Sequence, residues 1–171
     1  HTIMVAWGKT SLRYVSDTMA LRMSTMVISA PTDMATVAEA LLAIVRTDQR
    51  ATMIALHGEL GAGKTTLVQA IATALGIDQP VTSPTFVIMK HYAVENASRD
   101  LDRLIHIDAY RVEDPKEMAV IGFQELVDTP RTLICVEWAE NIAELLPDGY
   151  IDVTIEIAGT TGERHVTIHG N

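Results

Sequence analysis

The chain of 171 residues lacks the features that mark several large classes of protein. Its one cysteine, Cys135, excludes an internal disulfide framework, and its place in the apolar run TLICVEW is typical of a small buried side chain. No apolar run approaches the roughly 20 residues that a membrane helix needs. The chain has 13 basic and 22 acidic residues. Its net charge of −9 makes independent binding to nucleic acid unfavourable. A protein or small-molecule partner, no membrane, and a reducing cytoplasm are therefore expected.

The N-terminal segment differs in composition from the rest of the chain. It begins with His rather than Met, contains four methionines within 26 residues, and lacks the basic start and continuous apolar core of a signal peptide. We expect residues 1–25 to be an extension, a tag remnant or a misassigned start, and residues 26–171 to form a single domain. The alternative is that the segment supplies a real extra helix or strand.

After this segment, apolar strands alternate with helices. A helix begins after Thr32 or Asp33, either of which is a suitable cap, and Gly76 ends a second helix expected at Lys64–Leu75. YIDVTIEI and RHVTIH alternate apolar and polar residues on either side of AGTTGE, which predicts a C-terminal antiparallel hairpin. Further strands are expected at Met53–Leu56, at Phe86–His91, at Leu104–Ile107 and in TLICVEW, and short helices at Glu117–Val120, in IGFQELV and in AENIAELLP. The pattern predicts an α/β three-layer sandwich with a mixed, partly parallel sheet.

One glycine-rich stretch joins the strand at Met53–Leu56 to the following helix. The residues from Gly58 to Thr65 read GELGAGKT and fit the pattern G-x-x-x-x-G-K-[ST], with a strand before and a helix after it. Glycines let the backbone fold into a nest of N–H groups, and the positive end of the helix dipole begins at the same place. Lys64 then reaches the β- and γ-phosphates of a nucleotide, and the Thr65 hydroxyl is a ligand for Mg²⁺. The motif indicates a P-loop NTPase-like domain.

Two acidic residues stand where buried strands end. LIHID ends at Asp108 and LICVE ends at Glu137. Because the carboxyl ends of neighbouring parallel strands converge on a ligand in open α/β sheets, we expect both carboxylates beside the P-loop. A carboxylate next to Mg²⁺ is what phosphoryl transfer requires, since its catalysis consists mainly of positioning and charge neutralisation.

Several blocks in order give the chain a specific resemblance. GELGAGKTTL, VTSPTF, HIDAYR, GFQEL and VEW, followed by LP near the last hairpin, together resemble the bacterial TsaE family (formerly YjeE) of ATPases in tRNA threonylcarbamoyladenosine biosynthesis. The resemblance covers roughly residues 27–168. It implies a weak Mg²⁺-dependent ATPase that works with TsaB and TsaD, where TsaD installs the threonylcarbamoyl group on the adenosine next to the tRNA anticodon. The protein itself would meet tRNA only indirectly.

The resemblance also implies roles for individual residues. ATP would be held by Gly61, Ala62, Gly63, Lys64, Thr65 and Thr66, and Mg²⁺ by Thr65 and Glu137. Asp108 would align water near the γ-phosphate or contact a metal-bound water; Lys64, Asp108 and Glu137 form the catalytic set. Thr82, Ser83 and Thr85 would form a switch-like loop that Pro84 stiffens.

Alternative roles remain open for several other residues. Trp138 covers the site or faces TsaD, or is an ordinary core aromatic. Tyr110 and Arg111 serve the partner surface, with phosphate contact or a surface salt bridge as alternatives for Arg111. Arg164 approaches the nucleotide or is a solvated strand charge, and Thr32 and Asp33 touch adenine or cap a helix. The six histidines match no metal-ligand spacing and are interpreted as core or surface residues.

Two other functions remain open. A small-molecule kinase would also begin with strand, loop and helix, but it should carry a basic lid, and ENASRDLDR is short and of mixed charge. A nucleotide-dependent binding module with little hydrolysis is the other alternative, which the sequence distinguishes poorly from an ATPase.

Overall fold

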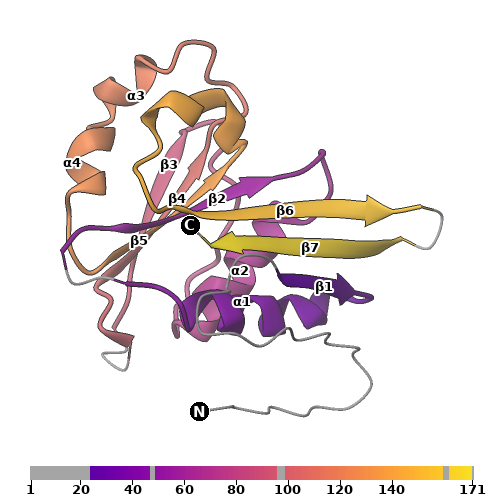
Figure 1. The fold of residues 1–171 in the computed structure, drawn as a ribbon. Coiled ribbons are helices and arrows are strands. Elements are labelled where there is room, and N and C mark those ends of the chain that lie inside the picture. The colour runs from indigo at the N-terminus through magenta and orange to yellow at the C-terminus, as the bar shows by residue number, and fades with distance from the viewer. Residues whose placement is uncertain (1–23, 47–48, 96–98, 160–161, 171) are drawn as a thin grey trace.

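A computed structural model describes residues 24–46, 49–95, 99–159 and 162–170 (Figure 1). The expected extension therefore lies outside the described residues, except for its last two positions. Ser24 and Thr25 belong to the first strand, β1 (Ser24–Ile28), which pairs with the C-terminal strand β7 (Glu163–Gly170) in antiparallel register.

All seven strands form one sheet in the order β1-β7-β6-β2-β5-β4-β3. The central strands β6, β2, β5 and β4 run parallel to one another, and the pairs β1–β7, β7–β6 and β4–β3 at the two edges are antiparallel. The prediction of a mixed sheet that ends in an antiparallel hairpin is thus confirmed. The remaining strands are β2 (Thr52–His57), β3 (Met89–Ala93), β4 (Arg103–Asp108), β5 (Thr132–Glu137) and β6 (Ile151–Ala158).

Helices cover both faces of the sheet, which confirms the three-layer sandwich (Figure 1). On one face lie α1 (Met34–Leu42), preceded by the 3₁₀ turn η1 (Pro31–Asp33), and α2 (Lys64–Ala74). On the other face lie α3 (Glu117–Val120), α4 (Phe123–Val127) and the 3₁₀ segment η3 (Ala139–Leu145). Gly76 ends α2 as predicted, with φ at +74°.

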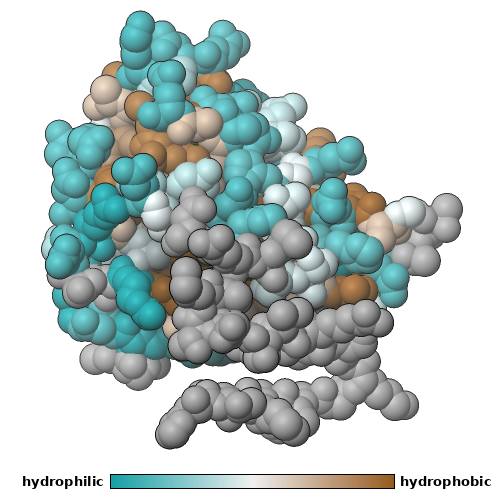
Figure 2. Space-filling view, viewed as in Figure 1, coloured by the Kyte–Doolittle hydropathy of each residue, from teal (hydrophilic) through white to brown (hydrophobic). Residues whose placement is uncertain are grey.

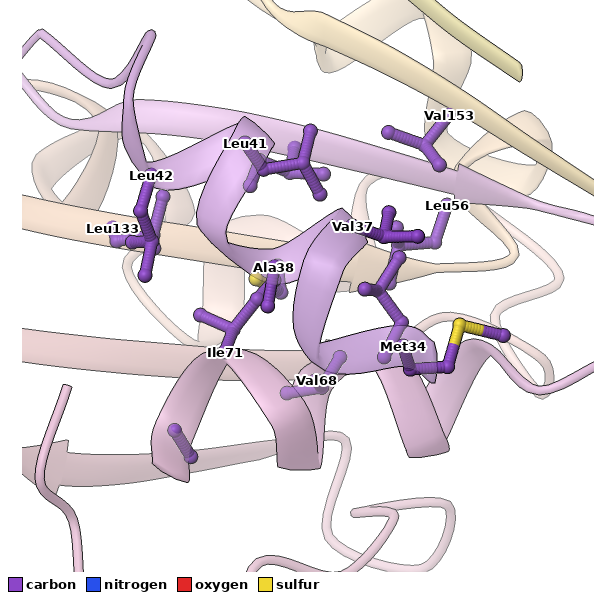
Figure 3. Packing of buried hydrophobic residues seen from close by; sticks show 14 of the residues in the cluster. Met34, Val37, Ala38, Leu41, Leu42, Leu56, Val68, Ile71, Leu133 and Val153 are labelled. Carbon is purple, nitrogen blue, oxygen red and sulfur yellow. The ribbon is translucent and has the colours of Figure 1, made fainter. Parts of the chain in front are cut away.

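The core beneath α1 and α2 follows from the alternation of side chains along each strand. In Figure 3, Val37, Leu41 and Ile71 of the two helices meet Leu56 of β2 and Leu133 of β5. All five are fully buried. At about 1.5–3 kcal/mol for each fully buried aliphatic side chain, this layer anchors α2 and the loop before it to the sheet.

Two local expectations are wrong in detail. The strand expected at Phe86–His91 begins only at Met89, because the carbonyl of Pro84 accepts the N–H groups of Val87 and Ile88 and closes a turn. The short helix expected in AENIAELLP is present as a 3₁₀ segment with a kink at Ile142. Asp33 does accept backbone N–H groups, but they belong to Ser29 and Ala30, which precede the helix.

The surface is largely hydrophilic on the face drawn in Figure 2, with hydrophobic residues gathered among the helices above the sheet and toward the far end of β6. Several large apolar side chains are exposed, among them Leu60, Phe86, Val87 and Val120. Within the described ranges, no helix combines the length and the apolar character required to cross a membrane.

Cys135 makes stability sensitive to alkaline pH. Burial raises the pKa of its thiol far above the usual value, and the nearby Glu137 carboxylate adds to this shift. The native state therefore keeps the proton when the unfolded chain loses it, so the free energy of unfolding falls as pH rises above about 8.5. We expect a slope approaching about 1.4 kcal/mol per pH unit in urea titrations. Cys135→Ala should be less stable at neutral pH but should lack this slope, and an unchanged slope in the variant would contradict the assignment.

Candidate functional site

The P-loop joins the carboxyl end of β2 to the first residue of α2. Its glycines adopt backbone angles that other residues rarely adopt: φ is +140° at Gly58, +81° at Gly61 and +114° at Gly63. At Gly58 the loop also passes close to β6, so that a Cβ atom there would lie 2.3 Å from the carbonyl oxygen of Ile155. Glycine is required at this position both by the backbone angle and by the close approach of the loop to β6.

Replacing Gly58 should therefore destabilise the fold more than replacing a glycine with a positive φ in open space. We expect Gly58→Ala to lower the free energy of unfolding by at least about 3 kcal/mol. Gly149 is the matched control, since its φ is +79° and a Cβ atom there would meet nothing within 4 Å. Gly149→Ala should lower the free energy by about 1–2 kcal/mol, the backbone strain alone. Equal losses in urea denaturation would contradict the close contact with β6.

The backbone amides of the loop fit an anionic group. Among the described residues, the backbone N–H groups of five residues between Gly61 and Thr66 make no hydrogen bond. The N–H of Ala62, in contrast, donates to the carbonyl of Glu59 at 3.1 Å, and Ala62 is buried. Unpaired donors at a helix N-terminus form a favourable site for phosphate. The five residues with unpaired amides are Gly61, Gly63, Lys64, Thr65 and Thr66.

Lys64 folds back over the loop. Its Nζ donates to the carbonyls of Gly58 at 2.6 Å and Glu59 at 3.0 Å, and it lies 3.9 Å from the centre of the Trp138 ring. Burial lowers the pKa of Lys64, while the carboxylates of Glu137, Glu140 and Asp108 oppose the shift. An ammonium group with neutral carbonyl partners in a partly desolvated place is well suited to exchange them for phosphate oxygens.

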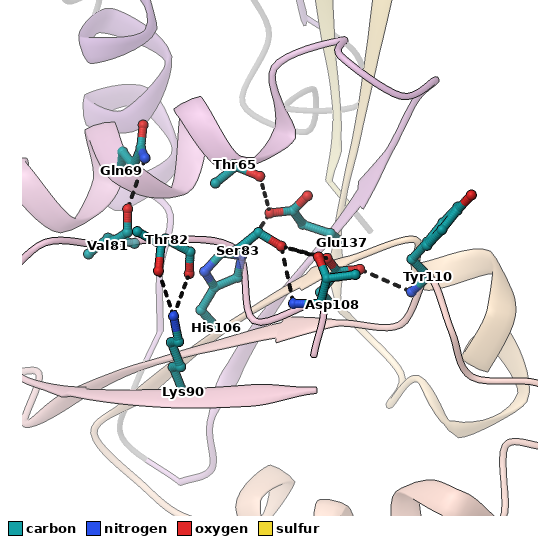
Figure 4. Close-up of polar contacts among 11 residues, drawn as sticks. Thr65, Gln69, Val81, Thr82, Ser83, Lys90, His106, Asp108, Tyr110 and Glu137 are labelled. Carbon is teal, nitrogen blue, oxygen red and sulfur yellow. Dashed lines mark hydrogen bonds and ion pairs between the residues drawn. The ribbon is translucent and has the colours of Figure 1, made fainter. Parts of the chain in front are cut away.

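The two predicted carboxylates lie side by side. Asp108 and Glu137 are register partners at the ends of β4 and β5, and both are almost fully buried. They share the face of the sheet that α2 covers, because they continue the alternation of Leu104 and of Leu133 with Cys135. The structure thus brings both acids to the start of α2, as the sequence predicts (Figure 4).

Glu137 is connected directly to the P-loop helix. Its Oε1 accepts the hydroxyl proton of Thr65 at 2.8 Å. Across the described residues, no group of three or more His, Cys, Asp or Glu side chains is arranged to hold a metal by itself. Mg²⁺ in nucleotide sites is usually bound by one or two protein groups together with phosphates and waters. A hydroxyl and a carboxylate beside unpaired amides fit that donor set.

Asp108 is held by the loop that precedes β3. Its Oδ2 accepts the hydroxyl protons of Ser83 at 2.7 Å and Thr85 at 2.6 Å, and its Oδ1 accepts the N–H of Tyr110 at 3.0 Å (Figure 4). Lys90 anchors the loop in turn, with Nζ donating to the hydroxyl of Thr82. The TSPTF segment and the acid therefore form one connected unit.

These groups surround one pocket of about 370 Å³. Most of the predicted site residues line it, with Ala62 as the exception among the proposed nucleotide contacts. Trp138 also lines the pocket, and its ring packs against that of Tyr110 with 5.0 Å between the centroids. The complete lining is Leu60, Gly61, Gly63, Lys64, Thr65, Thr66, Ser83, Thr85, Asp108, Tyr110, Glu137 and Trp138.

Other candidates lie outside the pocket. The guanidinium of Arg111 stacks 4.7 Å from the centre of the exposed Phe86 ring. Arg164 donates to the carbonyl of Gly162 at the end of the hairpin, as a solvated strand residue does. Neither Thr32 nor Asp33 lines the pocket.

Two histidines have contacts that the sequence interpretation missed. His57 lies between the carboxylates of Glu140 at 2.8 Å and Asp152 at 3.5 Å. His106 is fully buried, and its Nε2 lies 2.8 Å from Oε1 of Glu137. A signal for His106 was present, because it precedes Asp108 by two positions and so points to the same face of the strand.

The fold and the pocket together define a protein of the P-loop NTPase class. Residues 28–166 match the family model of the threonylcarbamoyl adenosine biosynthesis protein TsaE, and the chain belongs to this family.

Relatives agree with this assignment. The tRNA threonylcarbamoyladenosine biosynthesis protein TsaE of Streptomyces coelicolor is 39% identical over 122 residues, which are 69% of this chain and 79% of that protein. The protein of the same name from Bacillus subtilis is 39% identical over 115 residues, 67% of each chain. The crystal structure of Bacillus subtilis YdiB superposes with a TM-score of 0.68 at 29% identity, covering 87% of this chain and 86% of that one.

Proposed function

We propose that this protein binds and hydrolyses ATP with Mg²⁺ as an accessory protein of tRNA threonylcarbamoyladenosine biosynthesis, in the cytoplasm and together with TsaB and TsaD. The observation that carries the proposal is the convergence of Lys64, Thr65, Asp108 and Glu137 on one pocket next to unpaired loop amides. A glycine turn with a purely structural role would not require a lysine, a hydroxyl and two carboxylates around one pocket.

The position of each residue in the pocket supports a specific role in nucleotide binding. The unpaired amides of Gly61 and of residues 63–66 hold the phosphate oxygens, and Lys64 moves from the carbonyls of Gly58 and Glu59 to the β- and γ-phosphates. Thr65 and Glu137 hold Mg²⁺, which neutralises charge that develops on the phosphates. Trp138 and Tyr110 line the pocket with their rings packed together, and there they would limit the access of water to the phosphates.

Asp108 takes the part of the residue that orients the attacking water or a metal-bound water. Its three donors, from Ser83, Thr85 and Tyr110, fix the plane of its carboxylate. The two loop hydroxyls lie at the pocket wall, where a γ-phosphate would compete for them. The TSPTF segment is therefore placed to respond to the presence of that phosphate.

The partner proteins account for the charge of the chain. A net charge of −9 suits a protein that meets TsaB and TsaD rather than the tRNA itself. The transfer of the threonylcarbamoyl group is assigned to TsaD, and this protein supplies ATP turnover.

The experiment is phosphate release from Mg²⁺–ATP with and without purified TsaB–TsaD, with Lys64→Ala as the inactive control. We expect slow release alone, faster release with the partners, and none in the variant. Absence of both binding and stimulation by TsaB–TsaD would contradict the accessory role. Transfer of the γ-phosphate to a small-molecule acceptor would favour a kinase instead.

A further inference from the structure

Glu137, the proposed ligand of Mg²⁺, contacts a residue on the neighbouring strand that does not line the pocket. His106 lies on β4, opposite Cys135 of β5, and its side chain is wholly buried. It is absent from the pocket lining. Within the described ranges, its side chain makes one polar contact, the 2.8 Å approach of Nε2 to Oε1 of Glu137 (Figure 4).

The second ring nitrogen defines the form of the imidazole. Among the described residues, Nδ1 of His106 has no hydrogen-bond partner although it is buried. A proton on Nδ1 would leave a buried donor unpaired, whereas a proton on Nε2 is accepted by Glu137. Nε2 is therefore the nitrogen that donates to Glu137. An apolar side chain would fill the same space without burying an unpaired nitrogen, so packing alone does not account for a histidine here.

Glu137 receives two donors on the same oxygen. The hydroxyl of Thr65 and Nε2 of His106 both lie 2.8 Å from Oε1, whereas Oε2 has no partner in the described part of the chain. Two donors from different elements fix the rotation of a carboxylate that a single bond would leave free to turn. Because Thr65 has its one hydroxyl proton on Oε1, the lone pairs of its oxygen remain available to a cation.

We propose that His106 is a positioning residue for the magnesium site: it holds the Glu137 carboxylate in the orientation in which Oε2 and the Thr65 oxygen face the same ion. This inference rests on the proposed function of the pocket. His106 acts through Glu137 and does not contact the nucleotide. Residues that orient metal ligands in this way affect metal affinity by about 10–100-fold when they are replaced.

The test separates the affinity for Mg²⁺ from the affinity for the nucleotide. Binding of a fluorescent ATP analogue is measured at pH 8 in EDTA and then over a series of Mg²⁺ concentrations. His106→Leu removes the donor, and His106→Gln retains an N–H near the position of Nε2. His91→Leu is the control, because His91 is exposed on the neighbouring strand β3 and lies outside the pocket.

We expect His106→Leu to raise the half-saturating Mg²⁺ concentration about 10–100-fold, with affinity in EDTA changed by less than about 2-fold. His106→Gln should regain most of the loss, and His91→Leu should resemble the unmodified protein. A folded His106→Leu variant with unchanged Mg²⁺ dependence would overturn the proposal. So would a Gln variant as defective as the Leu variant.

A second readout needs no bound nucleotide. Nitrogen-15 NMR of the histidine-labelled protein should show His106, identified by the signal that His106→Gln lacks, with its proton on Nε2 and a bare Nδ1. A proton on Nδ1 would overturn the positioning role whatever the pocket binds. If the protein binds no Mg²⁺–nucleotide while His106 shows the expected tautomer, the proposed function fails and the bond to Glu137 stands.

Discussion

Replacing Lys64 by alanine is expected to weaken ATP binding by at least about 100-fold, which corresponds to about 2.7 kcal/mol. Charge-assisted hydrogen bonds contribute about 1.5–3 kcal/mol each, and Lys64 is positioned to offer more than one to the phosphates. The fold should survive, because the partners of Nζ are the carbonyls of Gly58 and Glu59 at the edge of the pocket. Isothermal titration calorimetry with Mg²⁺–ATP measures the loss.

The control for Lys64→Ala is Lys116→Ala, which removes the same charge from an exposed position outside the pocket. Lys64→Met preserves the length of the side chain and its contact with Trp138, so it shows whether the charge or the packing matters. If Lys64→Ala retains both its ATP affinity and its partner-dependent activity, the assignment of this loop as the phosphate-binding site is wrong.

The lowered pKa of Lys64 gives the same interaction a pH dependence. The ammonium form binds phosphate, so affinity is complete below the lowered pKa and falls as pH rises through it. Bound phosphate favours the charged form and raises this pKa, so binding at alkaline pH takes up a proton. The decline of affinity should therefore begin below the pH at which an exposed lysine loses its charge.

Much of the fold follows from local patterns in the sequence. Strands that are buried on both faces read as continuous apolar runs, and β2, β4 and β5 are of this kind. The hairpin of β6 and β7 shows the alternation of a sheet covered on one face, where α1 packs. The P-loop can be recognised in the sequence because its backbone angles require glycine at fixed positions.

What the sequence did not predict depends on contacts between distant segments or on rare backbone angles. Phe86 and Val87 look like strand residues but lie at an exposed turn, which ends at Ile88 with φ at +64°. Trp138 also has a positive φ, +57°, which turns its ring toward Lys64. No local signal predicts this angle in an aromatic residue. The contact of His106 depends on the register of β4 against β5, which only the folded sheet supplies.

The second large effect is expected at Glu137. Glu137→Gln should lower Mg²⁺-dependent ATP hydrolysis by at least about 100-fold, about 2.7 kcal/mol in the barrier, because the neutral amide no longer holds the cation. The amide oxygen still accepts protons from Thr65 and His106, so this variant should fold. Glu137→Ala should also lose hydrolysis, but it leaves both donors unpaired and is the less specific variant.

The pattern of effects distinguishes a metal ligand from a residue that merely lines the pocket. Glu137→Gln should retain nucleotide binding in EDTA, since the loop amides and Lys64 are unchanged, and should lose the gain in affinity that Mg²⁺ produces. Glu144→Gln is the matched control, because Glu144 is exposed on η3 and does not line the pocket. If hydrolysis continues unchanged in Glu137→Gln, the metal role moves to Asp108, whose carboxylate is its register partner on β4. Asp108→Asn in the same assay then decides which of the two acids holds the ion and which orients the water.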